Sequence, residues 1–447
     1  MPMTRRPAGA KLRVATITVL ILSALAYSAG AGAQQSQADD RKALLDRIEA
    51  LEKRLSELES SAVLSEPETR VKKVEVYVDQ NGVEHDEPVQ GAKKTVTYQR
   101  ERVYRRQTIS EKVEEALADH DAKSVVLGID AAMVTQGVSQ TEGPDSDADG
   151  QLYALASADL FFSARIAQNT TLFADIVGLS GSPPDSEVGG LTLLNGYAAR
   201  LVQQNQVNLR EAWMRTEFFD QKFALTLGRV DLTAFFDRNT AANDETTQFV
   251  SDALVNNPML GLSSNGAGAA IVYDPKGSWN VKLGVQQSDP NATNLSESMY
   301  TLAEVGYRAR PSFLGEGNYR GWYRTDNSVG VTRSAYGASI DQKLNSYITA
   351  FARYGNSEAD TGDDQFYSAG LQFEKGPVFN PMDVWGIGYA QLELASSEEE
   401  KLFETYYNLH LSEKLHLSFH LQYVIETRLG GDEQGFLVPG LRIQAGL

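Results

Sequence analysis

The sequence predicts an all-β fold, a 16-stranded antiparallel transmembrane β-barrel with an N-terminal α-helical coiled-coil segment. Three observations lead to it. Residues 124–447 alternate apolar and polar side chains over segments of about ten residues, tight turns and long polar loops connect these segments in turn, and no stretch after the first 33 residues approaches the roughly 20 apolar residues of a spanning helix. Strands with one apolar and one polar face fit a barrel that meets lipid outside and water inside.

The clearest alternation lies near the C-terminus. Residues 415–423 carry leucine, phenylalanine or tyrosine at every odd position, with serine, histidine and glutamine between them. Residues 401–411 repeat the pattern, and only Ser412 and Glu413 separate the expected strands 401–411 and 414–425, which predicts a hairpin. A soluble β-sandwich would also alternate, but its core requires the inner faces of both sheets to be apolar. The membrane barrel is therefore the favoured interpretation.

Sixteen strands are expected, and an even number places both termini on the periplasmic side of an outer membrane. Short turns such as Asp220-Gln221 then face the periplasm, and the long connections 179–207 and 232–265 face outward. The expected strands are 125–138, 151–166, 171–178, 208–219, 222–231, 266–274, 277–286, 299–308, 318–325, 334–342, 346–355, 364–374, 384–395, 401–411, 414–425 and 435–447.

Residues 1–33 have the three parts of a secretory signal: a basic start, an apolar run from Val14 to Ala26, and the small residues Ala31-Gly32-Ala33. We expect export to the bacterial outer membrane, in contact with its lipid and lipopolysaccharide. The chain has no cysteine, which excludes disulfides and thiolate chemistry, and its formal charge of −18 argues against nucleic acid as a partner.

Residues 38–64 carry a heptad pattern with apolar spacings of 4, 3, 4 and 3, which predicts a coiled-coil stalk. A homotrimer is expected through Leu44, Ile48, Leu51, Leu55 and Leu58. The alternative is a lone amphipathic helix, because three heptads are marginal in water. Residues 65–123 form a charged linker segment on the periplasmic side, with a hairpin near residues 79–82 and a helix after Ser110. Its basic run Lys93–Arg106 is either a peptidoglycan contact or a solvated strand.

A barrel of this size encloses a channel too wide to select solutes, so a loop must narrow it. The long loop after residues 222–231 is rich in amides, carboxylates and aromatic rings, which suit sugar hydroxyls and pyranose faces. The expected constriction and substrate-binding residues are Arg229, Asp231, Phe235, Phe236, Asp237, Arg238, Asn239, Asn243, Asp244 and Glu245. The expected lumen-lining residues are Glu211, Arg215, Glu217, His416, His420 and Arg442. Arg229 shares strand parity with outward residues, so either it lies above the lipid boundary or a bulge turns it inward.

The segments Leu227–Asp231, Phe235–Asp237, Asn243–Phe249 and Val255–Pro258 resemble the carbohydrate-selective outer-membrane porin family, as do Leu421-Gln422-Tyr423 and Gly440-Leu441-Arg442 near the C-terminus. The resemblance covers residues 124–447 and implies a sixteen-stranded channel through which sugars diffuse passively. The heptad segment and the basic run are not part of that family's usual core.

Competing functions remain open at this point. A porin for organic acids or for general solutes would differ only in its constriction residues, and a barrel that tethers the envelope could coexist with transport. An enzyme would need a Ser or Thr nucleophile beside a histidine, and no such motif is present in the sequence. We expect no cofactor and no metal. Asp145, Asp147 and Asp149 match only the first half of a calcium loop, and His410, His416 and His420 are more simply explained as lumen polarity.

Overall fold

The computed structural model describes residues 68–78, 84–85 and 93–103, and residues 125–446 except 168, 200–204, 263, 288, 290–297, 328–330, 376–377 and 413. The expected signal segment, the heptad stalk and the helix after Ser110 lie outside the described residues. Within the described part of the chain, no helix is both long enough and apolar enough to cross a membrane.

A small antiparallel sheet forms within the expected linker segment. Strands β1 (Glu68–Val78) and β3 (Lys93–Val103) pair along their whole length, and β2 (Glu84–His85) adds to the outer edge of β1. The connection between β1 and β2 falls at the predicted hairpin. The basic run is therefore a paired β-strand over most of its length.

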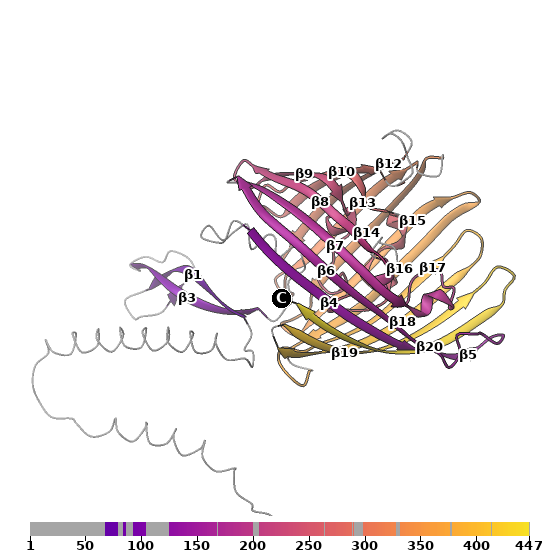
Figure 1. Cartoon of the computed structure of the whole chain (residues 1–447). Coiled ribbons are helices and arrows are strands. Elements are labelled where there is room, and N and C mark those ends of the chain that lie inside the picture. The colour runs from indigo at the N-terminus through magenta and orange to yellow at the C-terminus, as the bar shows by residue number, and fades with distance from the viewer. Residues whose placement is uncertain are drawn as a thin grey trace, which may run out of the picture. The chain divides into compact units, whose positions relative to one another are not determined.

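The second body is a closed antiparallel barrel in which each strand pairs with its neighbours in the sequence, and the last strand pairs with the first (Figure 1). β5 continues β4 after Val138, and both pair with β20, so they cross the barrel wall as one of sixteen strands. The strands are β4 (Val125–Gly137), β5 (Ser139–Glu142), β6 (Leu152–Ala167), β7 (Thr170–Ser182), β8 (Val207–Phe218), β9 (Phe223–Val230), β10 (Gly266–Tyr273), β11 (Trp279–Gln287), β12 (Met299–Ala309), β13 (Gly317–Asp326), β14 (Arg333–Lys343), β15 (Ile348–Ala359), β16 (Gly362–Glu374), β17 (Val384–Glu393), β18 (Glu399–Ser412), β19 (Leu415–Thr427) and β20 (Glu433–Gly446).

The alternation predicted from the sequence separates the two faces of the barrel wall. On β19, Phe419 is 52% exposed and Leu421 is 41% exposed, whereas Ser418, His420 and Gln422 are buried. Large apolar side chains cover the outer face in this way around the barrel, which suits contact with lipid acyl chains. The polar side chains point inward, where loops and other polar groups meet them.

The connections differ between the two ends of the barrel. At the end where β4 begins, the chain turns within residues 168–169 and 413–414, and the opposite end carries the long loops 183–206 and 231–265. Other connections at that opposite end, such as 360–361, are as short as the turns. The two long loops are thus the special feature of that end.

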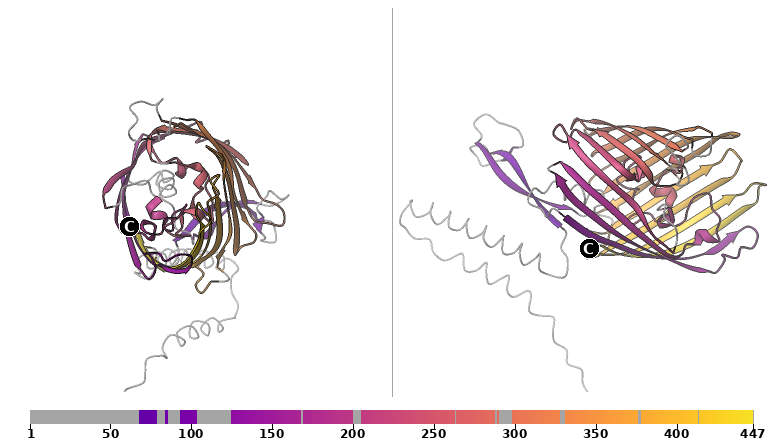
Figure 2. Two further views of the ribbon diagram at one scale, coloured as in Figure 1. Left: turned by 90° about the vertical axis from the view of Figure 1, so that its right-hand side faces the viewer. Right: turned by 45° about the horizontal axis from the view of Figure 1, so that its top comes forward.

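Both long loops enter the barrel. An end-on view shows their short helical turns inside the ring of strands (Figure 2). The main apolar core therefore lies inside the barrel, between the loop 231–265 and the wall. Phe249 of the loop meets Tyr406 and Phe351 edge to face, with ring centroids 4.8 Å and 5.6 Å apart.

Candidate functional site

The inner loop, residues 231–265, contains three short helical turns: η3 (Leu232–Ala234), α4 (Asp252–Val255) and η4 (Pro258–Leu260). Local polar contacts fix its course. The Asp231 side chain accepts from the amide of Thr233 at the start of η3, and Asn257 does the same for Met259 at η4. Gln248 accepts from the amide of Asn243, which closes the segment between η3 and α4. These contacts are short-range side-chain caps of backbone amides that are buried or partly buried.

Strand carboxylates anchor the inner loop to the barrel wall. Glu304 on β12 accepts from the amide of Asp237 at 2.6 Å, and Glu404 on β18 accepts from the amides of Val250 and Ser251 at 2.8 and 3.0 Å. On β14, Asp341 accepts from both the amide and the hydroxyl of Thr240. Hydrogen bonds to a charged acceptor contribute about 1.5–3 kcal/mol each, so three such anchors hold the loop strongly inside the barrel.

A buried ion pair adds a fourth anchor. Arg353 Nε on β15 lies 2.7 Å from Asp237 Oδ2, and both side chains are almost fully buried. Trp322 Nε1 donates to the other oxygen of the same carboxylate at 2.8 Å, and Arg353 also donates to the carbonyl of Leu254. Asp237 has φ +51°, a left-handed conformation that aspartate tolerates better than most residues. The pair joins both halves of the inner loop to the wall.

The companion loop, residues 183–199, was not expected to enter the channel, and it does. Glu400 on β18 accepts from the amides of Leu191 and Thr192. The carbonyl of Leu194 accepts from Gln136 and Gln422, which belong to strands β4 and β19. No local sequence pattern indicates this entry, because the residues that hold the loop are single polar positions on distant strands.

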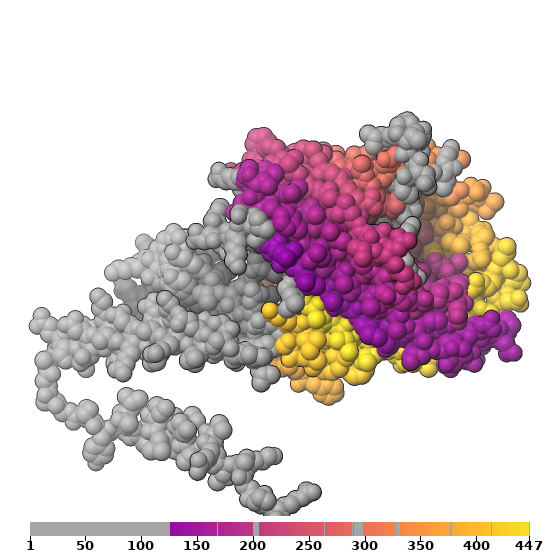
Figure 3. Space-filling view, in the orientation of Figure 1, coloured from indigo at the N-terminus to yellow at the C-terminus, as the bar shows by residue number. Residues whose placement is uncertain are grey.

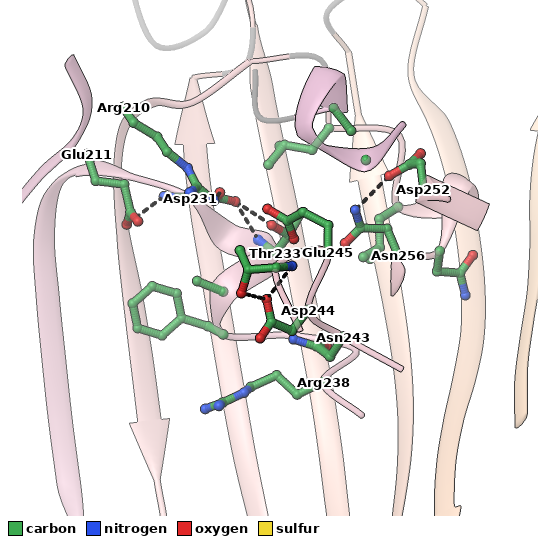
Figure 4. A pocket seen from close by; sticks show the side chains of 18 of the residues that line it. Arg210, Glu211, Asp231, Thr233, Arg238, Asn243, Asp244, Glu245, Asp252 and Asn256 are labelled. Carbon is green, nitrogen blue, oxygen red and sulfur yellow. Dashed lines mark hydrogen bonds and ion pairs between the residues drawn. The ribbon is translucent and has the colours of Figure 1, made fainter. Parts of the chain in front are cut away.

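Two chambers lie against the inner loop. The first has a volume of about 470 Å³ and lies among β8, the companion loop and the inner loop (Figure 4). The second has a volume of about 400 Å³ and extends towards the turns that join β10 to β11 and β12 to β13. The linings share three residues, Arg238, Asn243 and Asp244. These three side chains therefore lie between the two chambers.

The first chamber is acidic. Its charged lining comprises two arginines, Arg210 and Arg238, and seven carboxylates: Asp130, Asp159, Glu211, Asp231, Asp244, Glu245 and Asp252. Two aromatic rings, Phe173 and Trp213, also line it and stack on each other at 4.8 Å. The second chamber has a more balanced lining, in which Lys282, Arg308 and Arg320 accompany several amides.

A β-bulge builds one wall of the first chamber. Asp175 pairs with Glu211 and Ile176 pairs with Leu209, so Arg210 is an extra residue in β8. Strict alternation would turn Arg210 outward, but the bulge puts it on the same side as Glu211. Its guanidinium lies 3.1 Å from the carboxylate of Asp231. The bulge shifts the outward apolar positions of β8 from odd numbers, Val207 and Leu209, to even numbers, Met214 and Phe218. Sequence reasoning missed this change of parity and therefore missed Arg210.

Burial raises the pKa of two carboxyl groups in the loops. Burial raises the pKa of Asp252 in the inner loop to about 6, against the opposing hydrogen bond from Asn256. Burial also raises the pKa of Asp185 in the companion loop to about 7, although the amide of Leu194 donates to it. Both groups therefore titrate within reach of the pH range in which bacteria live.

Apart from Arg229, the expected constriction residues divide into two groups. Those that line one or both chambers are Asp231, Phe235, Arg238, Asn239, Asn243, Asp244 and Glu245. The side chains of Phe236 and Asp237 are instead buried between the loop and the barrel wall. Phe236 is 1% exposed and packs in the apolar core, and Asp237 is occupied by Arg353. These two residues stabilise the loop rather than face the solute path.

Arg229 does not turn into the lumen. Strand β9 runs without a bulge against both neighbours, so Arg229 keeps the outward parity of Leu225 and Leu227. Its Nε donates to the carbonyls of Leu209 and Arg210 at 2.9 and 3.2 Å. The bulge in β8 disturbs the pairing at these positions, and the guanidinium satisfies the carbonyls from the outer face.

The expected lumen-lining residues point inward, where other groups of the protein contact them. Glu211 accepts from the indole of Trp213, and Arg215 pairs with Glu217 at 3.0 Å. Arg442 is 1% exposed and donates to the carbonyl of Glu245. Of these six residues, Glu211 alone contributes to the lining of a chamber.

His420 lies in an arrangement that resembles a catalytic triad by distance. Ser418 Oγ is 2.8 Å from His420 Nε2, and Glu404 Oε1 is 2.8 Å from His420 Nδ1. The sequence was interpreted as lacking a nucleophile beside these histidines, so this contact corrects that statement. Ser418 is 1% exposed, however, and Glu404 holds the inner loop. The arrangement fastens the loop and leaves no path for a substrate.

The other two histidines of this hairpin, His410 and His416, contact each other. The rings of His410 and His416 meet edge to face at 4.9 Å. Among the described residues, no group of three or more histidine or acidic side chains is arranged to hold a metal ion.

A closed barrel of sixteen strands, apolar outside and narrowed by an inward loop, defines a porin-type channel of the outer membrane. A family model described as carbohydrate-selective porin, OprB family, matches residues 127–324 and 310–447. The chain belongs to this family.

Two relatives of known sequence match parts of the chain. A stretch of 202 residues is 28% identical to an uncharacterized protein of Aquifex aeolicus, and it covers 45% of this chain and 59% of that protein. A stretch of 196 residues is 27% identical to Porin AaxA of Chlamydia trachomatis serovar L2, and it covers 41% of this chain and 42% of that porin. The chain thus spans about half the length of these relatives.

Solved structures show the same fold. The high-pH structure of Pseudomonas putida OprB matches 72% of this chain and 94% of its own chain, with a TM-score of 0.62 and 15% identity. The low-pH structure of the same protein matches with a TM-score of 0.51 and the same identity.

Proposed function

We propose that this protein lets small carbohydrates diffuse passively across the outer membrane, through a channel narrowed by the inner loop. The observation that carries the proposal is that Arg238, Asn243 and Asp244 of the inner loop border both chambers. A guanidinium, an amide and a carboxylate can donate to and accept from sugar hydroxyls along the path. The aromatic rings of the first chamber offer apolar faces to the C–H groups of a pyranose.

The acidic first chamber separates this function from the organic-acid alternative. A dicarboxylate would have to pass seven carboxylates with two arginines among them. Like charges at such short range oppose entry, whereas a neutral sugar meets no such barrier. The family to which the chain belongs supports the same choice.

The test measures solute flux into proteoliposomes for glucose, maltose oligomers and a small dicarboxylate. The intact protein is expected to pass glucose faster than the dicarboxylate. The variant Arg238→Ala widens the space between the two chambers and removes a donor, so longer oligomers should enter faster and the discrimination by length should fall. Arg333→Ala is the matched control, because Arg333 pairs with Asp360 at the exposed rim.

Two results would contradict the proposal. Dicarboxylate flux equal to or above glucose flux in the intact protein would indicate a general or organic-acid porin. An Arg238→Ala variant that keeps the discrimination by length would show that the lining between the chambers does not select solutes.

A further inference from the structure

One carboxylate oxygen of the first chamber is left for a solute. Glu211 on β8 lines this chamber, and the residue is only 8% exposed. Two donors reach its carboxylate, Trp213 Nε1 at 2.9 Å and the amide of Asp231 at 3.3 Å, and both contact Oε2. Within the part of the chain that the structure describes, no group donates to the other oxygen, Oε1. Oε1 can therefore accept from a solute that enters the chamber (Figure 4).

An aromatic surface lies beside this carboxylate. The hydrogen bond from Trp213 holds the indole next to Glu211, and the same indole stacks on Phe173 of β7 with ring centroids 4.8 Å apart. Both rings line the first chamber. The face of an indole attracts a nearby ammonium group, and it also offers apolar surface to the C–H groups of a sugar ring. Carboxylate and rings together suit a cation that is attached to a partly apolar body.

The rest of the lining favours a positive solute. The other carboxylates of the chamber outnumber the arginines, and one of the two arginines, Arg210, is bound by Asp231 at 3.1 Å. The strands that carry Asp130, Asp159 and Glu211 form the indigo to magenta wall that faces the viewer in Figure 3, and this wall shows no opening. A solute therefore reaches the chamber along the channel, and it meets these carboxylates at close range.

We propose that the first chamber binds amino sugars, which are hexoses with a protonated amine, and that Glu211 Oε1 accepts from the ammonium group. This proposal rests on the proposed carbohydrate function and narrows it to one class of sugar. A basic amino acid would bring a carboxylate of its own against the acidic lining, whereas an amino sugar carries one cation and otherwise hydroxyls. A metal ion needs several convergent ligands, and among the described residues no group of three acidic or histidine side chains is arranged to hold one.

The chamber also suits the rest of such a solute. Its volume of about 470 Å³ lies within the range of roughly 300–1,000 Å³ that is typical of small-molecule sites. Asn243 and Asn256 of the inner loop line the same chamber, and a side-chain amide supplies both donors and an acceptor for sugar hydroxyls. Ammonium group, ring and hydroxyls therefore each meet a matching part of the lining.

Block of the channel current in planar bilayers measures the binding, because a solute held in the chamber obstructs the flow of ions. Glucosamine, N-acetylglucosamine and ethanolamine are compared at pH 7, where an amine of the α-amino kind is largely protonated. N-acetylglucosamine has the ring without the charge, and ethanolamine has the charge without the ring. Glucosamine should block the intact protein at a concentration at least about tenfold lower than either, since a carboxylate within about 4–6 Å favours a cation by that factor or more.

Two variants assign the effect to the carboxylate. Glu211→Gln keeps the size of the side chain and an acceptor oxygen for Trp213, and it removes the charge. It should raise the blocking concentration of glucosamine to that of N-acetylglucosamine. Glu217→Gln is the matched control, because Glu217 lies on the same strand, pairs with Arg215 at 3.0 Å and lines neither chamber. The preference for glucosamine should persist in this control.

The intact protein alone can overturn the proposal, whether or not the variants fold. Equal block by glucosamine and N-acetylglucosamine, or equal block by glucosamine and ethanolamine, would refute it, and so would a preference that persists in Glu211→Gln. Glucose flux separates this failure from failure of the proposed function. Glucose flux above dicarboxylate flux, without a preference for glucosamine, refutes the amino-sugar site and leaves the carbohydrate channel in place. Glucose flux at or below dicarboxylate flux refutes the carbohydrate channel itself.

Discussion

Removal of the Asp237 carboxylate should release the inner loop from the wall. In Asp237→Ala, the guanidinium of Arg353 remains, with a side chain that is 0% exposed, and the indole of Trp322 loses its acceptor. Leaving a buried charge without its partner costs about 3–5 kcal/mol. Since 1.4 kcal/mol is a factor of ten, a cost of about 4 kcal/mol lowers the preference for the docked loop roughly a thousandfold.

Single-channel conductance in planar bilayers and sugar flux in proteoliposomes measure the effect. Asp237→Ala should give a larger and noisier conductance and should lose discrimination between sugars of different length. Asp360→Ala is the control, because it breaks the pair of Arg333 with an aspartate that is 82% exposed. Surface pairs of this kind contribute little, so conductance should not change.

A double variant separates the anchor from the unpaired charge. Asp237→Ala with Arg353→Met removes both charges and leaves an apolar side chain in the buried site. It should recover part of the docked state, because the penalty of a lone buried guanidinium is gone. The reasoning is refuted if Asp237→Ala alone forms an intact barrel with the conductance and discrimination of the natural protein.

Three further predictions follow from the same contacts. Glu404→Ala removes the acceptor of two loop amides, so limited proteolysis should cut the inner loop faster than in Glu399→Ala, a change at the barrel rim that serves as the control. Asp185 has a raised pKa of about 7, so its contribution to the docked companion loop is fully present below about pH 4 and is lost as the pH rises through 7; conductance should rise across this window, and Asp185→Asn should abolish that dependence. Gly228 has φ +144°, and a Cβ there would lie 2.3 Å from a backbone oxygen, so Gly228→Ala should lower the melting temperature by several degrees or more, whereas Gly321→Ala meets nothing closer than 4.0 Å and should not.

The barrel could be predicted from the sequence because the two faces of each strand appear as a local alternation of apolar and polar residues. On β18, Phe403 and Leu411 face outward, and Glu404 and Tyr406 between them are buried, as the alternation indicates. The strand bounds agree to within a few residues for nearly every strand. Exceptions occur where the backbone departs from strict pairing, as at Val138, where β5 separates from β4.

The site was predictable only in part, because its contacts join residues far apart in the sequence. The composition of the inner loop pointed to residues that line the two chambers, but it could not show that Phe236 and Asp237 are buried against the barrel wall. That distinction depends on Arg353 and Trp322, which lie about a hundred residues further along the chain. The entry of the companion loop depends in the same way on Gln422.

The inward carboxylates of this acidic chain therefore have two physical roles. Glu304 and Glu404 accept from loop amides and are buried, so they hold the inner loop in its position. Asp244 and Glu245 line the first chamber, so they set the field that a solute meets there. Loss of an anchor should change the width of the path for every solute, whereas loss of a lining charge should change mainly the passage of charged solutes. Flux measured with both a neutral sugar and a dicarboxylate therefore distinguishes the two roles residue by residue.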